Sequence, residues 1–183
     1  MTKTASSAPV HRLALRVREM AQLFNSMDPS PFNDQDLDKA AEEFIVSWAG
    51  ELPRKADLEL VIHLVTPPPP DRLKGTEEAV RHYFASQAEV MKRDFRLLMR
   101  RGRLSMTIGL LFLAVCFALG EMVPRGSLAA WSEFVKLGLH IVGWVAMWRP
   151  LEIFLYDWWP IRSHQRLLER LARMKVRLVL PAT

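Results

Sequence analysis

Three short segments of the chain alternate apolar and polar residues with a period of two. They are RLALRVR at residues 12–18, DLELVIHLV at 57–65 and KVRLVL at 175–180. Successive side chains of a strand point to opposite faces, so this pattern predicts three strands that each bury one face. The outward residues are acidic in the middle segment and basic in the other two, which favours an acidic strand lying beside both basic ones.

A helical stripe separates the first two predicted strands. Its apolar members are Leu37, Ala41, Phe44, Ile45 and Trp48. Asp36 is the predicted N-cap, and Gly50 with Pro53 supplies the stop. Strand, helix and strand predict a parallel βαβ unit over residues 11–66, after a disordered tail at 1–10. The third strand, at 175–181, ends the chain, so a shared sheet makes the domain discontinuous.

A proline-rich linker at 67–75 follows the βαβ unit. Its PPPP run is interpreted as a stiff spacer, with a ligand for proline-reading domains as the alternative. Glu77 and Glu78 then occupy the first turn of a predicted amphipathic stalk helix over 76–103, where the helix dipole favours acids. Unless Gly102 breaks it, this helix continues into the apolar run that follows.

Residues 104–120 carry no charge, and the apolar run 104–123 is interrupted only by Glu121. About 20 helical residues cross a bilayer, so this run predicts a transmembrane helix rather than a buried soluble helix, which would normally be shorter. The sequence PRGS at 124–127 predicts a tight outer turn. A second transmembrane helix is predicted over 128–148. A frame at 137–159 is rejected because it places Arg149 near the membrane centre.

Basic residues flank the two predicted spans on one side only. Before the first stand Lys92, Arg93, Arg96, Arg100, Arg101 and Arg103, and after the second come Arg149, Arg162, Arg166 and Arg170. The connecting turn offers only Arg125, so the positive-inside rule places both termini in the cytosol. The net charge of +5 and pI of about 9.7 are thereby explained by anionic lipid headgroups rather than by nucleic acid.

The segment WRPLEIFLYDWWP at 148–160 mixes aromatic rings with charges and opens a predicted interfacial and cytosolic helix over 149–174. Aromatic side chains favour the headgroup zone, so the first interpretation is a belt that fixes depth, and the alternative is a docking surface for a partner. The docking residues would be Arg149, Glu152, Tyr156, Asp157, Trp158 and Trp159. Arg149 and Glu152 are three apart and can pair. The predicted apolar face consists of Leu151, Phe154, Leu155 and Trp158.

Glu133, Lys136 and His140 form a polar stripe on one side of the second predicted span. Ionisable groups inside a membrane can mark an ion or proton route. The alternative is structural, because Glu133 and Lys136 can pair and reach water near the helix end. Only His140 lies deep enough to require a partner.

Motifs for catalysis or cofactor binding are not recognisable in the sequence. No glycine-rich phosphate cradle occurs, the five histidines lack metal-ligand spacing, and Cys116 is alone. Ser, His and Asp occur without a recognisable nucleophile setting. We therefore predict no catalytic, cofactor-binding or metal-binding residue and a non-enzymatic protein.

Two stretches, QLFNSMDPSPFNDQDLDKAAEEFIVSWAGELP and WRPLEIFLYDWWP, resemble a family of small bacterial two-span inner-membrane proteins. The resemblance implies a bacterial inner-membrane location, and no function or catalytic residue is carried over from it. Within the first stretch DPSPF predicts a turn in which Asp28 and Ser30 bond nearby backbone, with a binding loop as the alternative.

The sequence therefore predicts an α+β membrane protein, with a transmembrane helical hairpin and a small discontinuous cytosolic α/β domain of about three strands. The expected function is a membrane anchor, adaptor or accessory subunit that has a protein partner or self-associates. The alternative is a small oligomeric channel or transporter subunit that uses the polar stripe.

Overall fold

The computed structural model describes residues 10–25, 27–31, 35–54, 56–67, 69–123 and 129–180. The predicted outer turn at 124–127 and nearly all of the predicted tail lie outside these residues. The chain forms two compact units. The α/β unit comprises the chain up to Met91 together with the residues from His164 onward, and the helical unit comprises Lys92–Ser163.

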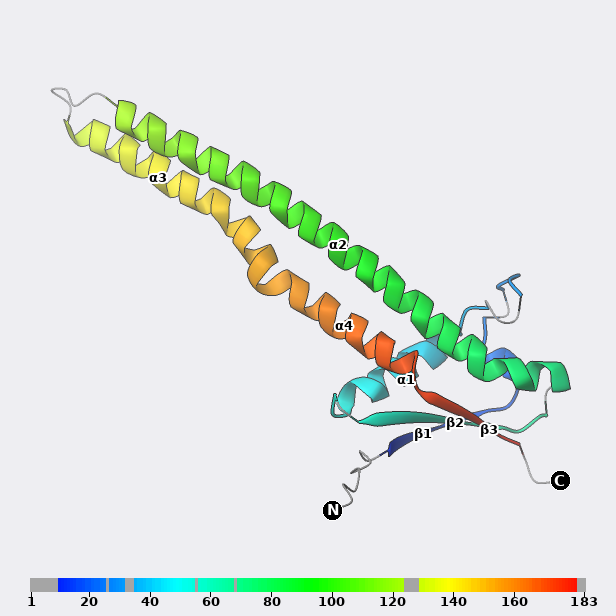
Figure 1. The fold of residues 1–183 in the computed structure, drawn as a ribbon. Helices are drawn as coiled ribbons and strands as arrows, with labels where there is room; N and C mark the ends of the chain where they lie inside the picture. The colour runs from blue at the N-terminus through cyan, green and yellow to red at the C-terminus, as the bar shows by residue number, and fades with distance from the viewer. Residues whose placement is uncertain are drawn as a thin grey trace, which may run out of the picture. The chain divides into compact units, whose positions relative to one another are not determined.

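A three-stranded parallel sheet forms the base of the α/β unit (Figure 1). It consists of β1 (Val10–Val17), β2 (Asp57–Leu64) and β3 (Lys175–Val179), in the order β1-β2-β3. The acidic strand therefore lies between the two basic ones, as predicted. Because β3 comes from the end of the chain, the sheet joins segments that are distant in sequence.

Helices cover one face of this sheet (Figure 1). They are α1 (Lys39–Glu51), the first part of α2 (Pro70–Met122) and the last part of α4 (Trp158–Leu171). The fully buried core residues between sheet and helices include Leu23, Ile45, Leu60, Ile62, Val80, Phe84 and Leu171. Most outward residues of the edge strands are exposed, so the described elements leave the other face open.

Helix α1 begins two residues later than the predicted cap suggests. Asp38, rather than Asp36, accepts a hydrogen bond at 3.0 Å from the backbone N–H of Ala40. Asp36 belongs to a short antiparallel pairing instead, because its carbonyl accepts from the N–H of Asn25 and the adjacent Leu37 bridges Phe24. Tertiary pairing upstream thus displaces the helix start. The helix continues through Gly50 and ends at Glu51, so of the two predicted stop residues only Pro53 lies beyond its end.

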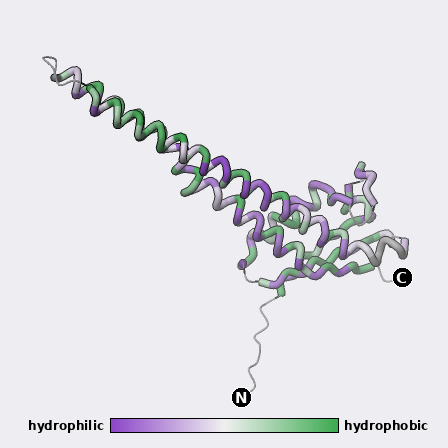
Figure 2. Tube along the Cα trace, turned by 45° about the horizontal axis from the view of Figure 1, so that its top comes forward, coloured by the Kyte–Doolittle hydropathy of each residue, from purple (hydrophilic) through white to green (hydrophobic). Residues whose placement is uncertain are grey.

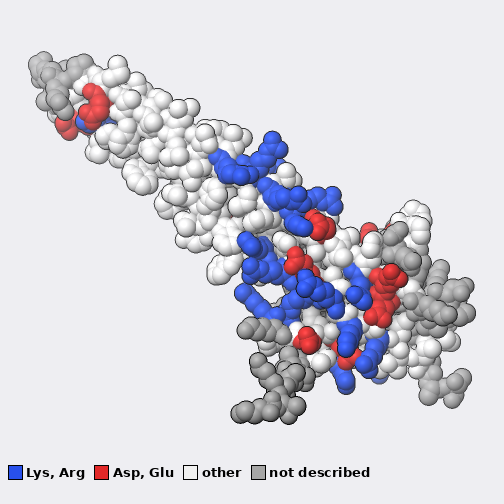
Figure 3. Space-filling model, viewed as in Figure 1, with Lys and Arg blue, Asp and Glu red and all other residues white. Residues whose placement is uncertain are grey.

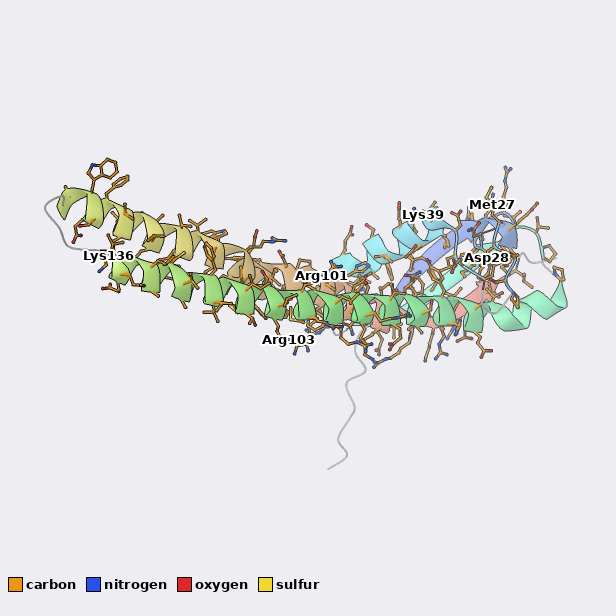
Figure 4. All side chains as sticks on the ribbon, turned by 90° about the horizontal axis from the view of Figure 1, so that it is seen from above. Met27, Asp28, Lys39, Arg101, Arg103 and Lys136 are labelled. Carbon is orange, nitrogen blue, oxygen red and sulfur yellow. The ribbon has the colours of Figure 1, made fainter. Side chains whose placement is uncertain are left out.

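Asp28 organises the connection between the 3-10 helix η1 (Met20–Gln22) and α1 (Figure 4). Its carboxylate accepts from the N–H of Ser30 at 3.0 Å and from the N–H of Asp36 at 2.8 Å. The Ser30 side chain lowers the pKa of Asp28 most, and the hydrogen bonds from the N–H groups of Asp36 and Ser30 lower it further. The predicted turn function of this residue is confirmed.

Helix α2 runs without interruption through the predicted linker, stalk and first span. It begins at Pro70, within the segment expected to be a linker, because proline is tolerated in the first helical turn, where its missing N–H is not needed. Gly102 does not break the helix. Its residues up to Met91 belong to the α/β unit and those from Lys92 to the helical unit.

In the helical unit, α2 and α3 (Ala129–Glu152) run antiparallel and pack closely at glycines (Figure 1). A Cβ at Gly109 would lie 3.1 Å from Met147 Sδ, and one at Gly143 would lie 2.8 Å from Leu113 Cδ1. Residues closer to the N-terminal end of α2 therefore contact residues closer to the C-terminal end of α3, as expected for an antiparallel pair. The glycines allow this approach because no Cβ separates the two backbones.

Pro150 lies inside α3, and the π-helix η3 (Ile153–Asp157) follows it. Proline cannot donate to the carbonyl four residues earlier, and such losses distort a helix locally. The π-helical turn also changes the predicted apolar face, because Ile153 is buried whereas Leu155 is 60% exposed. In this turn Trp158 Nε1 donates to the carbonyl of Phe154 at 2.7 Å.

Candidate functional site

The part of α2 that lies in the helical unit contains a long hydrophobic stretch (Figure 2), and many of its apolar side chains are exposed. Among the described residues one helix, Gly75–Met122, is long and apolar enough to cross a membrane, and 17% of its apolar window is buried. Leu104 is 63% exposed and Leu111 67%. Helix α3 does not meet the same criterion, because its charged residues, histidine and tryptophans lower its mean hydropathy.

The lysine of the polar stripe on α3 forms its ion pair with a residue of α2 rather than with another residue of the stripe. Lys136 Nζ lies 2.6 Å from Glu121 Oε1, near the start of α3 (Figure 4). Glu133 is exposed and lines a shallow groove of about 300 Å³ together with these two residues. The predicted Glu133–Lys136 pair is therefore replaced by a pair between the two helices.

His140 packs deeper between the helices. Its ring stacks on Phe117, with ring centroids 4.2 Å apart and an interplanar angle of 23°. The Nε2 atom is buried and has no hydrogen-bond partner among the described residues. Gly120 makes room for it, since a Cβ there would lie 3.3 Å from Nε2.

The predicted interfacial residues form an ion-pair cluster beside exposed rings. Arg149 lies 2.8 Å from Glu152 and 3.6 Å from Asp157, so the predicted Arg149–Glu152 pair is present. Tyr156 is 70% exposed and Trp159 65%, whereas Trp158 is only partly exposed. This mixture of paired charges and exposed rings suits the headgroup zone or a partner surface.

Exposed cations crowd the first part of α2 in the helical unit (Figure 3). They are Lys92, Arg93, Arg96, Arg100, Arg101 and Arg103. The Arg162 guanidinium lies 5.7 Å from the centroid of the Phe95 ring, at cation–π distance. Beyond Arg103, α2 contains no charged residue until Glu121.

A basic groove in the α/β unit was not predicted from the sequence. It has a volume of about 490 Å³ and lies where the three strands begin. Its cationic residues are Arg12, Arg54, Arg170, Arg173, Lys175 and Arg177, and its acidic residues are Asp57 and Glu59. We call this feature the basic groove.

Glu59 is the buried centre of the basic groove, with 2% of the residue exposed. Arg12 Nε donates to Glu59 Oε2 at 2.7 Å, and Arg177 Nε lies 2.7 Å from Oε1 as an ion pair. The hydrogen bond from Arg12 holds the pKa of Glu59 below its ordinary value against the opposing effect of desolvation, and the charges of Arg177 and Lys175 assist.

The residues of the basic groove are distant in sequence and become neighbours only through the register of the sheet. The groove was therefore not predicted from the sequence. Arg12, Glu59 and Lys175 are register partners across the three strands. The period-two pattern does place these side chains on outward faces, so a clue was present. Arg170 arrives from α4, where its Nη2 donates to the carbonyls of Pro53 and Ala56 at 3.1 and 3.0 Å.

Within the described ranges, no group of three or more His, Cys, Asp or Glu side chains is arranged to hold a metal ion. No protein-family model matches the chain, and no curated protein or solved structure is significantly similar to it.

Proposed function

We propose that this chain is an integral protein of the bacterial inner membrane and acts as an anchor, adaptor or accessory subunit without catalysis of its own. Helices α2 and α3 would cross the bilayer as a two-span hairpin, with both termini and the α/β unit in the cytosol. The exposed apolar surface of α2 carries this proposal, because an isolated patch of that extent is unfavourable in water and favourable in lipid.

The second span is supported by packing rather than by hydropathy. Its Lys136 is paired with Glu121, and both residues lie near helix ends from which side chains reach the interface. Its glycines pack against an apolar helix. A polar group in a membrane is less costly when it has a partner there. The exposed cations at the other end of the hairpin favour the cytosolic side.

Reporter fusions test this topology directly. A phosphatase fused at Gly126 should be active in the periplasm, whereas reporters at either terminus should indicate the cytosol. The protein should also remain with the membrane after alkaline carbonate extraction. Release by carbonate would exclude the membrane proposal, and termini on opposite sides would leave a single span.

The adaptor function is tested by affinity purification in mild detergent followed by mass spectrometry. The substitutions Tyr156→Ala and Trp159→Ala together should reduce capture of a stoichiometric partner if these exposed rings dock it. Trp131→Ala is the matched control, because Trp131 is 64% exposed at the other end of α3. Equal capture by all three proteins would assign the rings to the lipid interface alone.

The buried, unpartnered Nε2 of His140 supports a second candidate function, a subunit of an oligomeric channel or transporter. Two helices cannot enclose a pore, so this function requires assembly. Among the described residues, no atom lies within 4 Å of a Cβ added at Gly138, so another helix could approach there. Ion flux in reconstituted vesicles should then fall in His140→Leu. Absence of flux in the unsubstituted protein would exclude this function.

A further inference from the structure

We propose that the basic groove of the α/β unit binds a phosphate-bearing anion, and that Glu59 holds Arg12 and Arg177 in position for it. This site does not depend on the proposed anchor function. It assigns a ligand class to a surface that the anchor function leaves unexplained.

The basic groove contains more cationic residues than its own acidic residues can pair with. Six cationic residues face two acidic ones, which leaves an excess of four positive charges around one concavity. Surface charges of one sign normally spread apart or alternate with the other sign. Focused positive charge in a concavity attracts anions and raises their local concentration.

The two arginines contact Glu59 through Nε, which leaves their terminal nitrogens available to a ligand. Each approaches the carboxylate through Nε, and their side chains are 69% and 64% exposed. The terminal nitrogens of Arg12 and Arg177 have no hydrogen-bond partner among the described residues. Anchoring through Nε reduces the freedom that a long side chain loses on binding, so the forks are prepared for a ligand.

Phosphate matches this arrangement better than a carboxylate does. Guanidinium forks bind phosphate through paired charge-assisted hydrogen bonds, and phosphate groups bring enough charge to offset the excess. The volume of about 490 Å³ exceeds that of one phosphate and lies in the range of small-molecule sites. Val10, Leu58 and Met174 add an apolar lining for an organic part of the ligand.

The probe is inorganic pyrophosphate, titrated calorimetrically into the full chain in nanodiscs of zwitterionic phosphatidylcholine. We expect saturable binding at one site per chain that weakens as salt rises. Arg173→Gln combined with Lys175→Gln should raise the Kd about tenfold or more. Both side chains are exposed and form no hydrogen bond within the described part of the chain, so folding should persist. Arg16→Gln, on the same face but outside the groove, should leave the Kd unchanged.

The substitution Glu59→Gln distinguishes a site in which Glu59 positions the arginines from a surface that attracts anions by charge alone. The variant gains net positive charge, so a purely electrostatic surface would bind pyrophosphate more tightly. The proposed site should bind it more weakly, because the neutral amide has one acceptor oxygen instead of two and cannot hold both guanidinium groups. Circular dichroism of the variant should confirm that it is folded.

Nanodiscs containing phosphatidylglycerol identify the source of the phosphate. Weakened pyrophosphate binding there, in the unsubstituted chain only, would indicate that lipid headgroups occupy the groove. Unchanged binding would indicate a soluble ligand. The proposal is overturned by an absence of saturable binding in zwitterionic nanodiscs, by equal affinity in the Arg173 and Lys175 double variant, or by tighter binding in Glu59→Gln.

Discussion

Glu59 is buried in the middle strand, where an ionised carboxylate is stable only because cations surround it. Its pKa in the folded protein is lowered from the ordinary 4.5. A depressed pKa means that Glu59 stabilises the fold above about pH 4.5, and that this contribution is lost as the pH falls through the lower folded-state value. The unsubstituted protein should therefore lose stability in acid more steeply than Glu59→Gln. Thermal unfolding of both in detergent from pH 7 to 3 measures this, with Glu43→Gln, an exposed site, as control. Parallel curves would contradict it.

A second residue-scale prediction separates the two aspartates before α1. Asp38→Ala should destabilise the α/β unit by about 1 kcal/mol, because the Ala40 N–H loses its cap. Asp36→Ala should cost less, since its backbone rather than its side chain makes the described hydrogen bond. Denaturant unfolding followed by circular dichroism measures both changes. A larger loss of stability in Asp36→Ala than in Asp38→Ala would indicate that Asp36 is the N-cap, as the sequence predicted.

At the scale of elements, the α2–α3 pairing has a consequence for thiol chemistry. A Cβ at Gly143 would lie 3.2 Å from Cys116 Cβ, slightly less than the usual disulfide separation of about 3.5–4.5 Å, so a bridge can form once the Leu113 side chain shifts. Gly143→Cys should therefore form an intrachain disulfide with Cys116 under mild oxidation. Gly138→Cys should not, because no atom of the described residues lies within 4 Å of its added Cβ. Counting free thiols with a polymer-linked maleimide reads out both, and equal oxidation would show that this helix pairing is wrong.

Some features of the helices and strands could be predicted from sequence patterns, and others could not. The strands were predictable because alternation follows directly from strand geometry, and their order followed from the signs of the outward charges. The start of α1 was not predictable from local sequence, because the Phe24–Leu37 bridge competes with the local cap signal. The Lys136–Glu121 pair and the basic groove were missed because each joins different elements, and sequence spacing shows neighbours only along one element.

At the scale of the whole molecule, the α/β unit is completed by the last residues of the chain. β2 ends at Leu64 and its partner β3 begins at Lys175, so the helical unit is inserted between two adjacent strands. The entropy cost of closing such a loop rises only slowly with its length. Burial of Val176 and Leu171 against the core offsets this cost. Stability of the α/β unit should therefore depend strongly on β3, which follows the helical unit in the sequence.

Two aspartate substitutions on β3 test this dependence. Val176 is 5% exposed and faces the core, whereas Val179 is 40% exposed on the outward face. Val176→Asp should destabilise the α/β unit by roughly 3 kcal/mol or more, because an unpaired carboxylate would be buried. Val179→Asp should change stability by less than about 1 kcal/mol. In nanodiscs, a protease should then cleave residues 10–66 faster in Val176→Asp alone, while the proposed span at 104–122 should be protected by lipid in both variants. Equal cleavage would mean that β1 and β2 fold without β3, and the discontinuous domain would reduce to a βαβ unit with a loosely attached strand.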